Sequence, residues 1–243
     1  MTTVLFDLDG TLTSGDGLGT RCFFDAIEET FDLPSVDRDL HGYDACTDAG
    51  IVARLLADVR GRPAGEQELA KVRDRYLARL GAELERRPRA YRALPGAASM
   101  LRALPERLSV AVGLATANWE GAARMKLDSA ELGGPPLVGG FAEDGLERAA
   151  VVRASLERVP GARLPACYIG DRPCDVDAAR SLGMGFVGVG SGSNEAALRA
   201  AGAPSVIADY RDLDAFLDIV RAAPSPLSVA SGGGAADGAS RGL

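Results

Sequence analysis

The sequence predicts an α/β fold, in which helices cover a parallel sheet and a helical segment is inserted after the first strand. Three observations lead to this prediction. Short apolar runs that end at glycine or at polar residues recur along the chain, as buried parallel strands do. Helical patterns of about 10–15 residues lie between these runs, which is typical of βαβ units. The stretch that follows the first run contains helical patterns only.

The first strand is expected over residues 3–9, an apolar run that contains two aspartates and is stopped by Gly10. The later strands are expected at residues 108–115, 137–141, 166–169, 185–189 and 205–208. The core helices are expected at residues 97–104, 119–132, 146–159, 175–182, 194–201 and 213–221. Sheets of this kind bind ligands at the carboxyl ends of their strands, so the polar residues that follow each strand are the candidates for function.

The helical segment after the first strand is predicted to form a separate small domain over residues 14–92. Its helices are expected at residues 18–31, 50–59 and 65–86, and Leu94-Pro95-Gly96 marks the return of the chain to the sheet. Residues 1–13 and 93–221 then make up a Rossmann-like core domain. Residues 222–243 are rich in glycine, alanine and serine, so we expect a disordered tail there.

Composition and charge exclude several classes of function. The 34 acidic residues outnumber the 27 Lys and Arg, so the formal net charge is −7 and we expect neither a nucleic-acid nor a membrane partner. No apolar run is long enough to span a membrane, and the first residues lack the basic start of a secretory signal. The four cysteines form no CxxC motif. We therefore expect a cytoplasmic protein that acts on a small molecule, as a monomer or a homodimer.

Two aspartates stand at the end of the first predicted strand, in the sequence FDLDGT at residues 6–11. Asp7 and Asp9 would repel each other and lose hydration there, so a compensating cation is expected. A second acidic pair, Asp171 and Asp175, follows another strand and precedes a helix. Carboxylate oxygens, completed by water to an octahedron, are the ligands that Mg²⁺ prefers. The sequence therefore predicts a Mg²⁺ site at the carboxyl edge of the sheet.

A third strand end supplies groups that suit a phosphate. The strand at residues 108–115 is followed by Thr116, Ala117 and Asn118, and then by a helix. A hydroxyl group, backbone N–H groups and the positive end of a helix dipole together form a phosphate-binding seat. Each acidic cluster taken alone is explained equally well by helix caps and turns, where aspartate is common. All three strand ends in this order favour one shared site.

The ordered set of these motifs resembles the haloacid dehalogenase superfamily of hydrolases, most of whose members are phosphatases. The resemblance rests on DLDGT at residues 7–11, on Thr116 after a middle strand and on the GDxxxD pattern at residues 170–175. It covers nearly the whole chain, up to about residue 220. The helical segment matches the cap domain that the superfamily carries just after its first motif, so residues 14–92 are interpreted as an α-helical cap.

The resemblance also assigns roles to individual residues. Asp7 would be the nucleophile that forms an aspartyl-phosphate, and Asp9 the general acid and base whose backbone carbonyl also serves the metal. Asp171 would be a direct Mg²⁺ ligand and Asp175 a supporting or alternative ligand. The phosphate and substrate contacts would come from the sheet edge and the cap, namely from Gly10, Thr11, Thr116, Ala117, Asn118, Thr47 and Asp48.

The cap motif narrows the resemblance to the phosphoglycolate-phosphatase-like branch. Residues 43–51, YDACTDAGI, are similar to its Gly-x-Thr-Asp signature, with Ala45 in place of the glycine. The resulting expectation is a Mg²⁺-dependent hydrolase of a small phosphorylated metabolite. A phosphomutase with the same core and a phospho-ligand-binding regulatory protein without turnover are the alternatives. Dehalogenation is disfavoured because Asp9 is present, and phosphonatase chemistry would need Lys71, which is expected on an exposed helix face.

The superfamily places a lysine beside the nucleophile, at the start of the helix that precedes the last acidic strand end. No lysine occurs in that stretch, and Arg148 opens the helix, so we predict that Arg148 is the catalytic replacement. The alternative is a surface pair of Arg148 with Asp144 or Glu147. Lys126 is excluded because it lies ten residues after Thr116, about 15 Å along a helix axis.

Four further features are interpreted more simply. The sole histidine, His41, lies in the cap loop and could face the substrate, although most loop histidines are solvated. Cys174 is interpreted as a packing residue, and Trp119 is expected to pack at the start of its helix. The sequence GVGSGS at residues 188–193 follows a late strand, so we interpret it as a turn at the rim of the phosphate site and not as a dinucleotide-binding motif.

Overall fold

The computed structural model describes residues 3–39, 43, 46–133 and 138–223. Its main sheet contains β1 (Thr3–Phe6), β4 (Ala111–Ala115), β5 (Gly139–Gly140), β6 (Ala166–Gly170), β7 (Gly185–Val189) and β8 (Val206–Ile207). The six strands are parallel and follow the order β5-β4-β1-β6-β7-β8. The predicted α/β fold class is therefore confirmed, with the first strand at the centre of the sheet.

Helices cover both faces of the sheet because the central strands are apolar on both sides. Along β1, Val4 and Phe6 belong to one apolar cluster and Leu5 belongs to the other, and all three are fully buried. One face packs against α4 (Ala97–Leu108) and α9 (Leu213–Ala222). The other packs against α6 (Arg148–Arg158), α7 (Pro173–Ser181) and α8 (Ser193–Ala200).

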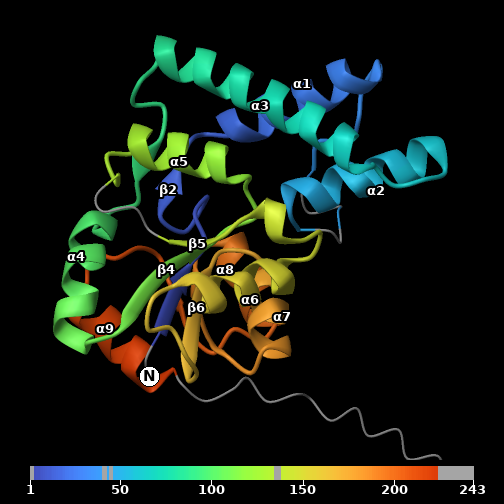
Figure 1. Ribbon diagram of the computed structural model, residues 1–243. Coiled ribbons are helices and arrows are strands. Elements are labelled where there is room, and N and C mark those ends of the chain that lie inside the picture. Colours follow the sequence, from blue (N-terminus) through green and yellow to red (C-terminus); the bar gives the residue numbers. More distant parts are fainter. Residues whose placement is uncertain (1–2, 40–42, 44–45, 134–137, 224–243) are drawn as a thin grey trace, which may run out of the picture.

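Three helices follow β1 and form the inserted segment: α1 (Leu18–Phe31), α2 (Asp48–Arg60) and α3 (Glu66–Arg86). The chain enters and leaves this segment through an antiparallel pair of short strands, β2 (Thr13–Ser14) and β3 (Arg92–Ala93). Helix α3 packs against α1 and against α5 (Glu120–Ser129) of the core, so the inserted helices lie over the carboxyl ends of the strands (Figure 1). No helix in the described residues is long and apolar enough to cross a membrane.

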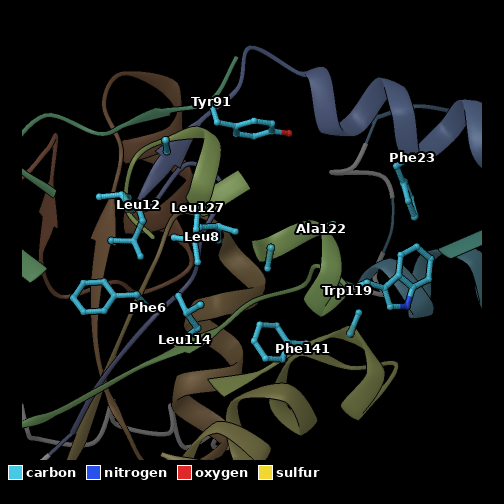
Figure 2. Close-up of a cluster of buried hydrophobic side chains, with 14 of the residues drawn as sticks. Phe6, Leu8, Leu12, Phe23, Tyr91, Leu114, Trp119, Ala122, Leu127 and Phe141 are labelled. Atoms are coloured by element: carbon cyan, nitrogen blue, oxygen red, sulfur yellow. The ribbon is translucent and has the colours of Figure 1, made fainter. Parts of the chain in front are cut away.

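An apolar cluster joins the inserted helices to the core (Figure 2). Trp119 stands at the start of α5 and is almost fully buried. The ring of Phe23 from α1 lies 5.9 Å from its indole, and the ring of Tyr76 from α3 lies 6.1 Å from it, measured between centroids. Aromatic pairs at such separations add about 0.5–1.5 kcal/mol beyond the area that they bury. The expected packing role of Trp119 is confirmed.

Some element boundaries differ from the sequence expectations. Helix α4 runs to Leu108 and not only to residue 104, because the carbonyl of Pro105 still accepts from the amide of Ser109 and closes the last turn. Strand β4 accordingly begins only at Ala111. Helix α9 includes Ala222, the first residue of the expected tail. The rest of that tail from residue 224, the predicted strand start at 137, His41 and Ala45 lie outside the described residues.

Candidate active site

The loop after β1 carries Asp7 and Asp9 to the carboxyl edge of the sheet. It turns sharply, with the amide of Gly10 donating to the carbonyl of Thr13 at 2.7 Å. Gly10 has a φ angle of 78°, and a Cβ atom on it would lie 2.1 Å from Oδ2 of Asp171. Glycine is needed at this position because the loop backbone passes directly against the second acidic cluster.

Three carboxylates gather at this edge, since oxygens of Asp7, Asp171 and Asp175 all lie within 4.8 Å of one another. Burial raises the pKa of Asp7 to about 6, although the charge of Arg148 opposes the shift. Burial and the neighbouring carboxylates raise the pKa of Asp171 well above its ordinary value. Among the described residues, Oδ1 of Asp171 is a buried oxygen that accepts no hydrogen bond. An unsatisfied carboxylate oxygen beside two others fits a divalent cation, so this group could hold a metal ion.

Arg148 joins the two acidic clusters from the start of α6. Its Nη1 lies 3.2 Å from Oδ1 of Asp7, its Nε lies 2.8 Å from Oδ1 of Asp175, and only 4% of its side chain is exposed. The alternative surface partner, Asp144, pairs with Arg158 instead. Burial alone would lower the pKa of Arg148, but the two carboxylates raise it well above its ordinary value. The structure thus places a permanent cation beside the predicted nucleophile.

Lys126 also reaches the site, so its exclusion on the basis of distance was wrong. Its Nζ pairs with Oδ2 of Asp9 and lies 2.5 Å from Oδ1 of Asn118. The exclusion measured length along a helix from Thr116, but α5 begins only at Glu120. Helix side chains also point back toward the N-terminus, and the lysine stem adds further reach. Both first-motif aspartates therefore have a cationic partner.

The loop after β4 brings the predicted phosphate contacts to the same edge. The amide of Thr116 donates to the carbonyl of Gly140 at 3.1 Å, which fixes the end of the strand. The Thr116 hydroxyl accepts from Nδ2 of Asn118 at 2.9 Å. Ala117 and Asn118 line the main cavity, whereas Thr116 and Thr11 are fully buried and do not line it. Ala117 and Asn118 are thus the residues of this segment that face the cavity.

The two predicted site residues from the inserted segment lie in different surroundings. The Thr47 hydroxyl caps α2 by accepting from the amide of Gly50 at 3.0 Å, and it donates to the carbonyl of Leu146 at 2.9 Å. Thr47 therefore fastens α2 to the core and does not line the cavity. Asp48 lines the cavity, and its Oδ2 accepts from the amide of Trp119 at 3.1 Å. Burial raises the pKa of Asp48 to about 7.

These groups surround a cavity of about 570 Å³ between the sheet edge and the inserted helices. Of the predicted residues, Thr11, Thr47, Thr116 and Asp175 do not line it. Besides the other predicted residues and Lys126, its walls contain Gly19, Thr20, Phe23, Cys46, Ile51, Tyr76, Arg172, Ser193, Asn194 and Ala197. The apolar members of this set follow the same helical periodicity as core residues, so no separate sequence signal marks them. Of the sequence GVGSGS at residues 188–193, the first two residues end β7 and only residues 190–192 form the expected turn, while Ser193 begins α8 and lines the cavity.

Comparison with known proteins agrees with this geometry. A model of the haloacid dehalogenase-like hydrolase family matches residues 1–183. A hydrolase from Pseudomonas syringae is similar in structure, with a TM-score of 0.70 and 23% identity over 90% of this chain and 99% of that one. So is a predicted phosphatase from Clostridium acetobutylicum, with a TM-score of 0.61 and 20% identity over 91% and 98%.

A third similar structure is a predicted phosphoglycolate phosphatase from Haemophilus somnus, with a TM-score of 0.61 and 17% identity over 89% of this chain and 97% of that one. At such identities, the three structures establish the fold alone. No curated protein sequence matches the chain. The family match and the arrangement of the sheet edge are therefore the basis for any statement on function.

Proposed function

Because the chain belongs to the haloacid dehalogenase-like hydrolase family, we propose that it hydrolyses phosphate monoesters of small metabolites with Mg²⁺. The observation that carries the proposal is the position of Asp7. It lies in a group of three carboxylates that could bind a cation, and the guanidinium of Arg148 is beside it. A carboxylate can attack phosphorus where such charges offset those of the phosphoryl group.

In the proposed reaction, a carboxylate oxygen of Asp7 attacks phosphorus, and the bond between phosphorus and the ester oxygen breaks. Asp9 gives its proton to that oxygen, and the alcohol leaves. Asp9 then takes a proton from water, whose oxygen attacks the phosphorus of the aspartyl-phosphate and releases inorganic phosphate. The accessibility of the two side chains supports these roles, because Asp7 is buried whereas 42% of the Asp9 side chain is exposed at the cavity wall.

Asp7 and Asp171 are the carboxylates that would hold Mg²⁺. The ion would offset negative charge on the phosphoryl group and on the buried acids. Asp175 has both oxygens occupied, Oδ1 by Arg148 at 2.8 Å and Oδ2 by the amide of Arg172 at 3.0 Å. We therefore propose that Asp175 orients Arg148 and does not bind the ion directly. This is the supporting role that the family resemblance implies for Asp175.

The size and lining of the cavity support the proposal of a small substrate. Its volume of about 570 Å³ lies within the usual range for sites that enclose small molecules. Phe23, Ile51 and Tyr76 form an apolar part of its wall, and Asp48 adds a polar group beside them. Such a wall suits the organic part of a phosphate ester, while the sheet edge takes the phosphoryl group. We propose a substrate of the size handled by phosphoglycolate-phosphatase-like enzymes.

The proposal is tested with p-nitrophenyl phosphate in Mg²⁺ and in EDTA. We expect phosphate release in Mg²⁺ and its loss in EDTA. Asp7→Asn should lower turnover by at least ~10⁴-fold, because an amide cannot attack phosphorus. Lys71→Met, which alters an exposed lysine on α3, should behave as wild type.

Circular dichroism establishes that the variants are folded. A folded Asp7→Asn protein with near-wild-type turnover contradicts the mechanism. A wild-type protein that releases no phosphate in either condition, yet is stabilised against heat by inorganic phosphate, is a phospho-ligand-binding protein and not the proposed enzyme.

A further inference from the structure

The reaction above leaves the ammonium group of Lys126 without a role, although this group belongs to a connected set of side chains that includes Asp9. It pairs with Oδ2 of Asp9 and donates to Oδ1 of Asn118 at 2.5 Å. Nδ2 of Asn118 donates to the same oxygen of Asp9 at 3.0 Å and to the Thr116 hydroxyl at 2.9 Å. Lys126 and Asn118 therefore both donate to one carboxylate oxygen of Asp9, and the hydrogen bond between Lys126 and Asn118 holds the two donors in place.

This arrangement leaves the second carboxylate oxygen of Asp9 for the reaction. Among the described residues, the side-chain hydrogen bonds of Asp9 all involve Oδ2. Asp9 is 42% exposed at the cavity wall, whereas Lys126 is only 3% exposed. An exposed carboxylate without such contacts would sample several rotamers, and proton transfer requires one defined direction. Fixing Oδ2 determines where Oδ1 points.

Lys126 is itself confined from the side of the inserted helices. Its Nζ lies 5.5 Å from the ring centroid of Tyr91, next to β3. A Cβ atom on Gly19 of α1 would lie 3.0 Å from Nζ and 2.5 Å from the Tyr91 hydroxyl. The ammonium group of Lys126 is thus confined by Asp9, by Asn118 and by the ring of Tyr91.

We propose that Lys126 is a positioning residue for the general acid and base, separate from the action of Arg148 on the nucleophile. The inference rests on the proposed phosphatase function. Each aspartate of the first motif then has its own cation, with Arg148 beside Asp7 and Lys126 beside Asp9. The competing explanation is a buried ion pair that only supports the fold.

The two explanations differ in how the effect of losing Lys126 depends on the leaving group. Proton donation by Asp9 matters most for a poor leaving group, as in phenyl phosphate. It matters least for p-nitrophenyl phosphate, whose phenolate leaves without a proton. The constant kcat/KM covers the steps up to departure of the phenol, so it excludes the later hydrolysis of the aspartyl-phosphate. A purely structural defect would lower kcat/KM equally for both esters.

The test compares Lys126→Met with wild type on both esters in Mg²⁺. We expect kcat/KM to fall by ~10²-fold for phenyl phosphate, as for a misplaced catalytic group, and by less than ~10-fold for p-nitrophenyl phosphate. Lys126→Arg should recover part of the loss, because it keeps the charge with a different shape. Lys71→Met, at the only other lysine of the chain, is the matched control and should change neither value.

Equal losses on the two esters, or no loss on either, overturn the proposed role and assign Lys126 to the fold. If Lys126→Met does not fold, Lys126→Gln, which keeps a donor without the charge, is measured against the same two outcomes. A wild-type protein that releases no phosphate from either ester overturns the proposed function, and this inference with it. Failure of the function and failure of the inference therefore give different results.

Discussion

The sheet edge and the inserted helices use the same charged residue types in opposite ways. At the sheet edge, Arg148 and Asp175 form an ion pair whose side chains are 4% and 0% exposed. On α2, the pair of Arg54 and Asp58 has side chains that are 53% and 54% exposed. Removing one partner of a buried pair costs about 3–5 kcal/mol, whereas an exposed pair contributes about 0–1 kcal/mol. Burial of the charge, and not its presence, therefore distinguishes the site.

The pKa values of the carboxylates show the same contrast. Burial raises the pKa of Asp7 to about 6 and that of Asp48 to about 7. On the surface, the hydrogen bond from Arg62 lowers the pKa of Glu68 to about 2. Glu68 is therefore stabilised in its charged form, whereas burial destabilises the charged forms of Asp7 and Asp48. Carboxylates in that condition are typical of functional sites, where a bound cation or substrate offsets the charge.

Among the changes that test this contrast between buried and exposed charges, the largest effect is expected at Arg148. Arg148→Ala should lower kcat by at least ~10²-fold, because it removes a preorganised charge beside Asp7. It should also lower the free energy of unfolding by about 3–5 kcal/mol, since Asp175 loses its partner. Arg148→Lys should restore part of both losses. A kcat/KM within about threefold of wild type, roughly 0.7 kcal/mol, would exclude a part for Arg148 in the transition state.

A smaller, pH-dependent effect is expected from Asp48. The ordinary pKa of this carboxyl is 3.8, and the folded protein raises it to about 7, so the folded state keeps a proton that the unfolded chain has lost between these values. Its contribution therefore destabilises the fold increasingly as the pH rises through that range. Asp48→Asn should raise the free energy of unfolding by at least ~1 kcal/mol near pH 8 and leave it unchanged near pH 4.

Urea denaturation of both proteins across this pH range measures the difference. A stability difference that does not change with pH would show that Asp48 ionises alike in the folded and unfolded chains. Activity should not be used as the readout here, because Asp48 also lines the cavity.

The smallest effect is expected from the exposed pair on α2. Asp58→Ala removes the partner of Arg54 four residues away on an open helix face. The free energy of unfolding should fall by about 0.5 kcal/mol or less, and kcat should not change. Thermal unfolding at low and high salt measures both the size and the screening of this pair. A fall in the free energy of unfolding above ~2 kcal/mol would show that this exposed pair contributes as much as a buried one, against the contrast between buried and exposed charges.

The parts of the site that follow strands could be predicted, because the end of a parallel strand fixes where the next residues lie. Asp7, Asp171 and Thr116 needed only that rule to be placed together. Arg148 could be placed only with the help of the family resemblance, which puts a cation at the start of the helix that α6 forms. In each case, the position in the sequence determines the position at the edge to within a few residues.

Lys126 and Tyr76 could not be placed in this way. Lys126 reaches Asp9 through the length and direction of its side chain, which the spacing along a helix does not describe. Tyr76 lines the cavity only because α3 packs over the sheet, and its spacing is the same as that of a core residue. Thr47 differs in the opposite way. Its place in a motif predicts a contact with the substrate, but its side chain caps α2. How the inserted helices dock is a tertiary property without a local signal.

The central place of β1 in the sheet also has a consequence for how the chain folds. Thr3 pairs with Ala111 on one side and with Ala166 on the other, and the contact between Asp7 and Arg148 spans 141 residues. Contacts of such long sequence separation form slowly, because the entropy of loop closure opposes them until the intervening chain is ordered. During synthesis, Asp7 and Asp9 emerge from the ribosome well before Lys126 and Arg148, the cations that pair with them. We therefore expect the site to assemble late in folding. It should form when the central sheet is completed and not when the helices first form.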